Sequence, residues 1–153
     1  MDLPPTNQQS VRERKGEVFV TTPMGSRMGF TADQLILEIG HSKDCDETLR
    51  QEIIGITSNQ FLSGEVHEVV DAVLIWWRDG DGDLVDELVD GLTYLSETGQ
   101  IWVLTPKAGR PNHVEPSDIQ DAAPIAGLSQ TSTLAVASDW SATRLVARKS
   151  AKR

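Results

Sequence analysis

Residues 69–77, with the sequence VVDAVLIWW, decide the fold of this chain. The run is apolar apart from one acid and is rich in β-branched and aromatic side chains, so it predicts a strand that is buried on both faces. Residues 84–92 follow, with apolar side chains along one face of a helix. Residues 101–104, with the sequence IWVL, form a second buried run. This order of strand, helix and strand predicts a right-handed βαβ crossover in a parallel sheet.

The segment before this unit predicts one more strand and one more helix. Residues 35–39, with the sequence LILEI, end at Gly40, and a short apolar run closed by glycine favours a buried strand. A second interpretation stays open, because residues 31–34 have the form of a capping box that begins a helix. Residues 46–56 predict a helix, with the side chain of Asp46 available to cap its N-terminus.

The segment after the crossover predicts a helix and a hairpin. Residues 115–127 predict the helix, with Pro116 near its first position. Residues 130–137 and 142–148 are two short runs rich in Thr, Val, Leu and Ala, and turn-forming residues 138–141 join them. The sequence therefore predicts an α/β fold of three layers, with a mainly parallel sheet of about five strands and a C-terminal antiparallel hairpin.

The length of 153 residues suits one domain, which we expect over residues 22–149. Residues 1–21 are mostly polar and show no apolar period, so they predict a disordered or loosely attached segment. Residues 150–153 continue a short basic tail.

The net charge of −9 is spread unevenly along the chain. Residues 38–90 carry fourteen acids and three bases, whereas residues 91–153 carry five acids and seven bases. An acidic middle repels phosphate backbones and anionic lipids, so we expect neither nucleic acid nor a membrane as partner. The chain opens without a secretory signal, and Cys45 is its only cysteine, which together favour the reducing cytoplasm.

Motifs for metal, cofactor and covalent chemistry are weak. Residues 79–83 read DGDGD, but Leu84 and Asp90 stand where a calcium-binding EF-hand loop needs glycine and glutamate, so we interpret them as a loop between a strand and a helix. Cys45 lies near a helix N-terminus between two acids, and a catalytic role for it is a minor alternative. The three histidines lack ligand spacing. We therefore expect no metal, no cofactor and no catalytic residues.

The best candidate for a ligand site is the edge of the sheet where its strands end. Ligands of open α/β sheets bind beyond the carboxyl ends of the strands. Five residues follow strand ends or the hairpin turn and could hold an anionic metabolite there: His41, Arg78, Lys107, Arg110 and Trp140. The alternative is that local acids such as Asp79 or Asp139 neutralise these cations, in which case the cluster is structural.

A second candidate is a protein interface on the helix of residues 84–92. Its exposed side is predicted to carry acids that attract a basic partner: Asp83, Asp86, Glu87 and Asp90. The alternative is that these acids form an ordinary solvated helix face. We interpret the chain as a non-catalytic binding or regulatory module that acts through contact with a protein partner. The alternative function is a binding protein or enzyme for an anionic metabolite at the carboxyl edge.

Four segments resemble one protein family. They are residues 70–78 (VDAVLIWWR), 102–109 (WVLTPKAG), 139–141 (DWS) and 144–146 (RLV). They resemble DUF3052, a mainly actinobacterial family of unknown function, and the resemblance runs from about residue 22 to about residue 149. It implies a fold and no activity.

A weaker resemblance is to the class I methyltransferases, whose first strand and first glycine look like residues 35–40. The glycine-rich turn that lets backbone approach a cofactor is missing after Gly40. Residues 40–68 also leave no room for two further strand–helix units, including the one that supplies an acid to the ribose. The resemblance therefore implies a shortened, degenerate Rossmann-like fold that does not bind S-adenosylmethionine.

Overall fold

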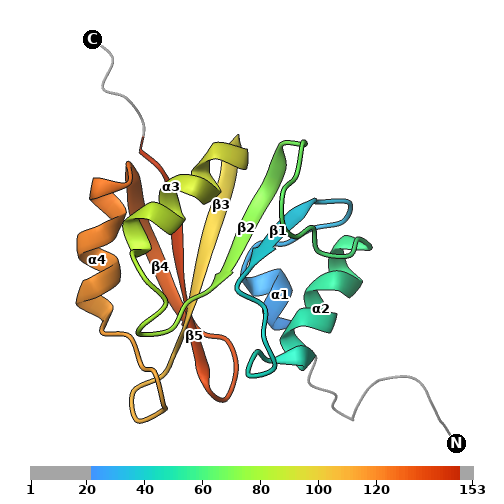
Figure 1. The fold of residues 1–153 in the computed structure, drawn as a ribbon. Helices are drawn as coiled ribbons and strands as arrows, with labels where there is room; N and C mark the ends of the chain where they lie inside the picture. Colours follow the sequence, from blue (N-terminus) through green and yellow to red (C-terminus); the bar gives the residue numbers. More distant parts are fainter. Residues whose placement is uncertain (1–21, 149–153) are drawn as a thin grey trace, which may run out of the picture.

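The structure, a computed structural model, describes residues 22–148 (Figure 1). The expectations for residues 1–21 and 150–153 lie outside the described residues. Five strands form one sheet in the order β1-β2-β3-β5-β4. Their bounds are β1 Ile36–Ile39, β2 Val70–Trp76, β3 Leu95–Pro106, β4 Leu128–Ala135 and β5 Trp140–Ala147. The helices are α1 Met24–Arg27, α2 Glu47–Thr57, α3 Leu84–Tyr94 and α4 Pro116–Ile125.

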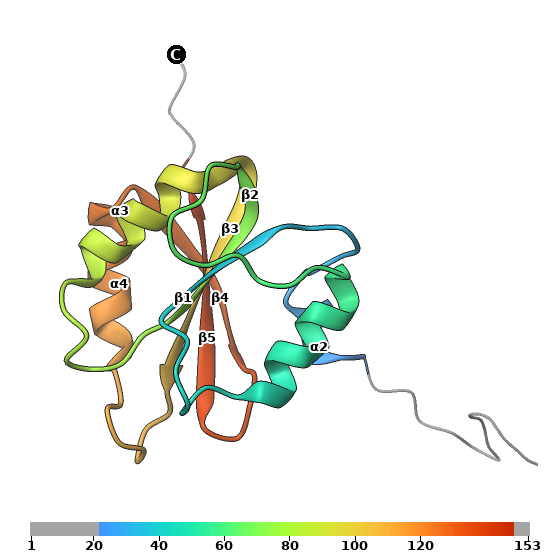
Figure 2. The same ribbon diagram turned by 45° about the vertical axis from the view of Figure 1, so that its right-hand side comes forward.

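The predicted α/β class and three layers are confirmed. Strands β1, β2 and β3 are parallel, and β5 runs antiparallel to both β3 and β4. Figure 2 shows α3 and α4 on one side of the sheet and α2 on the other. Trp76 belongs to the core on the side of α1 and α2, whereas Trp77 belongs to the core on the side of α3 and α4. Adjacent residues of one strand thus anchor both layers.

The helices begin where the sequence provides caps. The carboxylate of Asp46 accepts a hydrogen bond from the amide of Leu49 at 2.8 Å, and that of Asp83 accepts one from the amide of Val85 at 2.9 Å. These bonds satisfy amides that have no partner within the first turn of a helix. No helix among residues 22–148 is long and apolar enough to cross a membrane.

Strand β3 begins earlier than predicted. The second buried strand was predicted over residues 101–104, after Gly99, but α3 ends at Tyr94 and β3 follows at once from Leu95. The pairing with β2 is irregular here, since Val70 pairs with Leu95 and Ala72 with Gln100. A Cβ at Gly99 would lie 2.8 Å from the carbonyl oxygen of Asp71. Gly99 therefore lies within β3, where it permits β2 and β3 to approach each other closely.

The centre of the sheet supplies the first prediction. Leu104 of β3 is fully buried, as the sequence predicted. Its truncation removes apolar contacts and leaves a cavity, so we expect Leu104→Ala to lower the free energy of unfolding by about 2–5 kcal/mol. A urea titration measures this loss. The matched control is Val89→Ala on α3, where the side chain is 45% exposed and a much smaller change is expected. Equal changes in the two variants would contradict the strand assignment.

Candidate functional site

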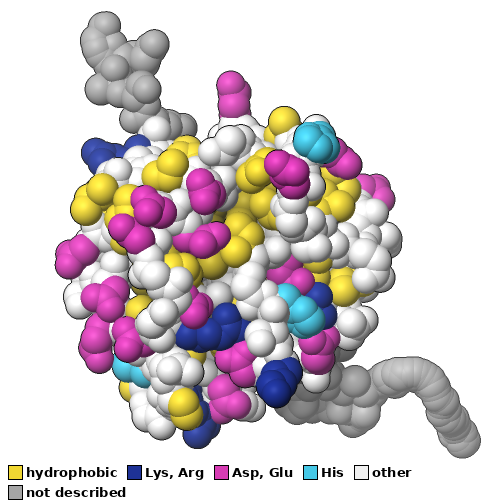
Figure 3. Space-filling view, in the orientation of Figure 1, with side chains coloured by type: hydrophobic (Ala, Val, Ile, Leu, Met, Phe, Trp, Pro, Cys, Tyr) yellow, Lys and Arg dark blue, Asp and Glu magenta, His cyan; other side chains and the backbone are white. Residues whose placement is uncertain are grey.

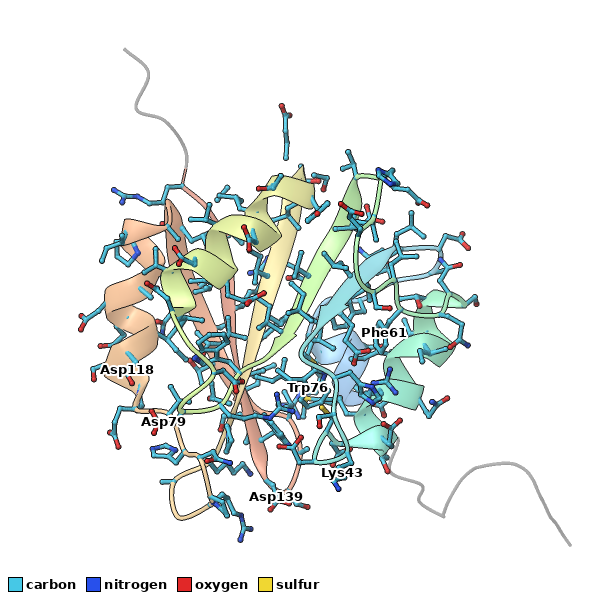
Figure 4. The ribbon with its side chains drawn as sticks, in the orientation of Figure 1. Lys43, Phe61, Trp76, Asp79, Asp118 and Asp139 are labelled. Carbon is cyan, nitrogen blue, oxygen red and sulfur yellow. The ribbon has the colours of Figure 1, made fainter. Side chains whose placement is uncertain are left out.

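All five residues of the predicted ligand site lie at the carboxyl end of the parallel strands. The hairpin turn lies there too, because the amide of Lys107 donates to the carbonyl of Asp139 at 2.9 Å. Figure 4 shows Lys43, Asp79 and Asp139 at this end of the sheet. The loops after β1, β2 and β3 and the turn before β5 therefore share one edge, which is where ligands bind in open α/β sheets.

Arg78 is held by the protein itself at this edge. Its Nε and Nη2 atoms donate to the two carboxylate oxygens of Asp44 at 2.9 and 2.6 Å. Its Nη1 donates to the carbonyls of Gly40 and Trp76 at 3.0 and 3.1 Å. The hydrogen bond with Asp44 raises the pKa of Arg78, and the same bond lowers the pKa of Asp44. The guanidinium thus ties the loop after β1 to the end of β2.

Trp140 is part of the core beneath Arg78. The side chain is 3% exposed, and its ring packs edge-on against that of Trp76, with centroids 4.9 Å apart. Its indole Nε1 donates to the carbonyl of Asp44 at 3.2 Å. The guanidinium carbon of Arg78 lies 5.4 Å from the Trp140 ring centroid, so a cation already covers this aromatic ring.

The remaining cations are mostly paired with local acids. His41 contacts Glu47 at 2.9 Å, and Arg110 contacts Asp139 at 2.8 Å. The half-buried Lys107 makes no side-chain hydrogen bond or ion pair within residues 22–148. The geometry therefore resembles the structural alternative more than an open anion site. Ligand binding at this edge stays a prediction.

Cys45 packs beside this network. The amide of Ser42 and the Nη2 of Arg78 donate to its sulfur at 3.2 and 3.4 Å. Burial, which is the largest influence, raises the pKa of the thiol. A thiol with a raised pKa stays protonated at neutral pH and is a poor nucleophile, so the geometry gives a catalytic cysteine no support.

A buried ion pair on β1 was missed in the sequence. The carboxylate of Glu38 is 6% exposed and accepts from Nε and Nη2 of Arg50 at 2.6 and 2.7 Å. It also accepts from the indole nitrogen of Trp76 at 2.8 Å. The hydrogen bonds that Arg50 donates to Glu38 raise the pKa of Arg50, whose guanidinium lies 5.1 Å from the ring centroid of Phe61. A single acid in the apolar run 35–39 was the signal for this pair.

A groove lies between α3, β1 and the connection of residues 60–64, and we call it the α3 groove. Its volume is about 780 Å³. The apolar part of the lining comes from Leu37, Ile39, Phe61 and Tyr94. Figure 3 shows hydrophobic side chains flanked by acids on this face of the molecule.

Two of the four predicted interface acids line this groove, and the other two lie outside it. Glu87 and Asp90 line it, whereas Asp83 caps α3 and Asp86 is exposed beside the cap. Burial is the largest influence that raises the pKa of Glu87, and the charge of Asp90 raises it further. Glu87 is thus a partly buried acid beside the exposed Asp90, and no ion pair within residues 22–148 neutralises either of them.

The groove lies at the edge of the sheet, where a single β-bridge is the last backbone pairing beyond β1. Leu62 pairs with Leu37 in parallel, donating its amide to Ile36 at 2.9 Å and accepting from Glu38 at 2.8 Å. The connection therefore covers part of the β1 edge without forming a strand.

Within residues 22–148, no group of three or more His, Cys, Asp or Glu side chains is placed to hold a metal ion.

The fold defines the class first. Similar solved structures include the pyocyanin biosynthetic protein PhzM (TM-score 0.63, 12% identity) and the methyltransferase CcbJ from Streptomyces caelestis (TM-score 0.54, 10% identity). Each likeness covers 82% of this chain, with 54% of PhzM and 94% of CcbJ. The chain thus spans about half the length of PhzM. At such identities the likeness shows a methyltransferase-like fold alone, and it confirms the fold predicted from the sequence.

The particular family follows from the sequence. The family model described as "Protein of unknown function (DUF3052)" matches residues 25–149, so the chain belongs to this family, as its resemblance predicted. The uncharacterized proteins Rv2239c of Mycobacterium tuberculosis and Mb2263c of Mycobacterium bovis are each 49% identical to it over 124 residues. These matches cover 81% of this chain and 78% of each relative.

The pair of Arg78 and Asp44 predicts a pH dependence. A carboxyl whose pKa is lower in the folded than in the unfolded state stabilises the fold fully above its ordinary pKa, here 3.8, and loses that effect as the pH falls through the folded value. We expect Asp44→Asn to lower the free energy of unfolding at pH 6, and its difference from the wild type to shrink below about pH 4. Urea titrations from pH 3 to 7 measure this, with the exposed Asp79→Asn as control. A difference that is constant down to pH 3 would contradict the role of the pair.

The edge of β1 predicts that S-adenosylmethionine does not bind. Gly40 has a φ of +84°, and a Cβ there would lie 2.4 Å from the carbonyl oxygen of Trp76, so internal packing accounts for this glycine. The connection through Leu62 occupies the edge beside β1. We expect isothermal titration calorimetry to give no binding up to millimolar ligand, with the O-methyltransferase NcsB1, which was solved in complex with S-adenosylmethionine, as positive control. Micromolar binding would overturn the view that the fold lacks a cofactor site.

Proposed function

We propose that this protein is a non-catalytic binding module whose α3 groove holds a segment of a protein partner that carries both apolar and basic side chains. The observation that carries the proposal is the meeting of apolar walls and unneutralised acids in one groove. The half-buried Ile39, Phe61 and Tyr94 offer apolar surface, and Glu87 and Asp90 lie beside it.

The apolar walls favour a partner that excludes water. Burying apolar surface contributes about 25 cal/mol per Å², and the half-buried Ile39, Phe61 and Tyr94 have such surface left to bury. A groove of about 780 Å³ with such walls suits a short extended or helical peptide segment.

The acids favour a basic partner. Desolvation and the charge of Asp90 raise the pKa of Glu87, so the ionised form of Glu87 is held at a cost. A lysine or arginine from a partner would offset the desolvation of Glu87 and its repulsion by Asp90. The net negative charge of residues 38–90 would speed the approach of such a partner.

The cations of the carboxyl edge support a role without catalysis. Arg78 and Arg110 are paired with acids, and burial raises the pKa of the Cys45 thiol. A nucleophile or general base needs a group with matched pKa and open access, and neither arginine nor this thiol offers one.

The groove is tested by affinity capture from the host's own lysate with paired variants. We expect Glu87→Lys with Asp90→Lys to lose a partner that the wild type captures at fixed stoichiometry, because the groove charge is reversed. The matched control is Asp118→Lys with Asp121→Lys, which makes the same change of charge on α4. A protein lost from the groove variant and kept by the control supports the proposal. Identical captures from the wild type and both variants would overturn it.

A further inference from the structure

Arg144 of β5 is the third half-buried arginine of the described chain, and its surroundings differ from those of the other two. Its Nε donates to the side-chain oxygen of Gln100 at 2.6 Å. Gln100 is 8% exposed and donates its amide nitrogen to the carbonyl of Met28 at 3.2 Å, so both ends of this amide are engaged. The guanidinium is therefore held from one side by a neutral group that cannot turn away.

The other two half-buried arginines each hold a carboxylate through two nitrogens. Arg50 binds Glu38 in this way, and Arg78 binds Asp44. Within residues 22–148, Arg144 has no carboxylate partner, and the only other hydrogen bond of its guanidinium is a long one of 3.4 Å to the hydroxyl of Thr131. Asp and Glu outnumber Lys and Arg by 23 to 14 in this chain, so a half-buried arginine without an acidic partner is unusual here.

The rest of the guanidinium faces a pocket of about 390 Å³. The last turn of α1 brings a second arginine, Arg27, to this pocket, and no hydrogen bond or ion pair within residues 22–148 involves its side chain. Thr98 and Ser132 contribute hydroxyl groups to the lining. The only acid in the lining is Asp71, which accepts a hydrogen bond from the amide of Leu35 at 2.8 Å and forms no ion pair with either arginine.

We propose that this pocket binds a small molecule through an oxyanion group, a phosphate or a carboxylate, with the fork of Arg144 as its main ligand and Arg27 as the second cation. A guanidinium presents paired N–H donors that match two oxygens of either group. Gln100 fixes the direction of the fork before the ligand arrives, which lowers the entropic cost of binding. Arg27 is exposed and can fold over a bound anion.

This site is independent of the proposed protein partner. The pocket shares no lining residue with the α3 groove, and it lies apart from the cations at the carboxyl edge. Failure of one proposal therefore leaves the other untouched.

The test is a titration of the full chain with inorganic phosphate and, separately, with malonate, followed by isotope-edited NMR at low chloride. We expect saturable shifts of the Arg144 Nε–H signal and of the Gly29 and Ser132 amides. Arg144→Gln should weaken the apparent Kd by about tenfold or more, since charge-assisted hydrogen bonds are lost. Arg27→Gln should weaken it severalfold. Tighter binding of phosphate identifies a phosphoryl ligand, and tighter binding of malonate identifies a carboxylate.

The matched control is Arg148→Gln, which removes the same charge from an exposed residue that does not line this pocket. Its Kd should equal that of the wild type. If Arg144→Gln fails to fold, Arg144→Lys keeps the charge and loses the fork, and the exposed Arg27→Gln tests the pocket without touching the core. The proposal is overturned if neither anion saturates, or if Arg27→Gln and Arg148→Gln weaken binding equally.

Discussion

Apart from the half-buried Asp71, every residue of strand β2 is buried, and the rest of the molecule is arranged around that constraint. Residues 72–75 are fully buried, with side chains on both faces and backbone partners on both edges. A strand of this kind needs a helical layer on each face and a neighbour on each side. The two helical layers, and the strands β1 and β3 beside it, are therefore consequences of one apolar run.

The polar groups that enter this core are matched to one another. Trp76 brings its indole N–H into the layer under α2, where Glu38 accepts it, and Arg50 neutralises the carboxylate. A buried charge that loses its partner is strongly destabilising, so these residues act as a unit. Just after the end of β2, Arg78 forms an ion pair with Asp44 and thereby holds the loop after β1 in place. The carboxyl edge, which binds cofactors in related folds, is used here to hold the loops together.

The two proposed sites lie where this matching stops. The sheet ends beside β1 at a single bridge through Leu62, and the α3 groove with its unneutralised Glu87 and Asp90 opens next to it. Arg144 stands on the other side of the parallel strands with Gln100 where the other half-buried arginines have a carboxylate. In both places a charged group has no ion-pair partner among residues 22–148, acidic in one place and basic in the other.

The sequence by itself determined the elements and their order, because apolar periods, caps and turns act over a few residues. The run 69–77, the cap Asp46 and the hairpin turn were all predicted, and with them the three-layer fold. The start of β3 was wrong, since a close approach to β2 at Gly99 has no local signature. Only the tertiary structure decided which charges meet. Asp44 and not Asp79 neutralises Arg78, and Arg144 meets Gln100, across 34 and 44 residues respectively. Contacts between residues so far apart in the chain depend on the register of the strands and on the packing of the layers. A local sequence pattern determines neither of them.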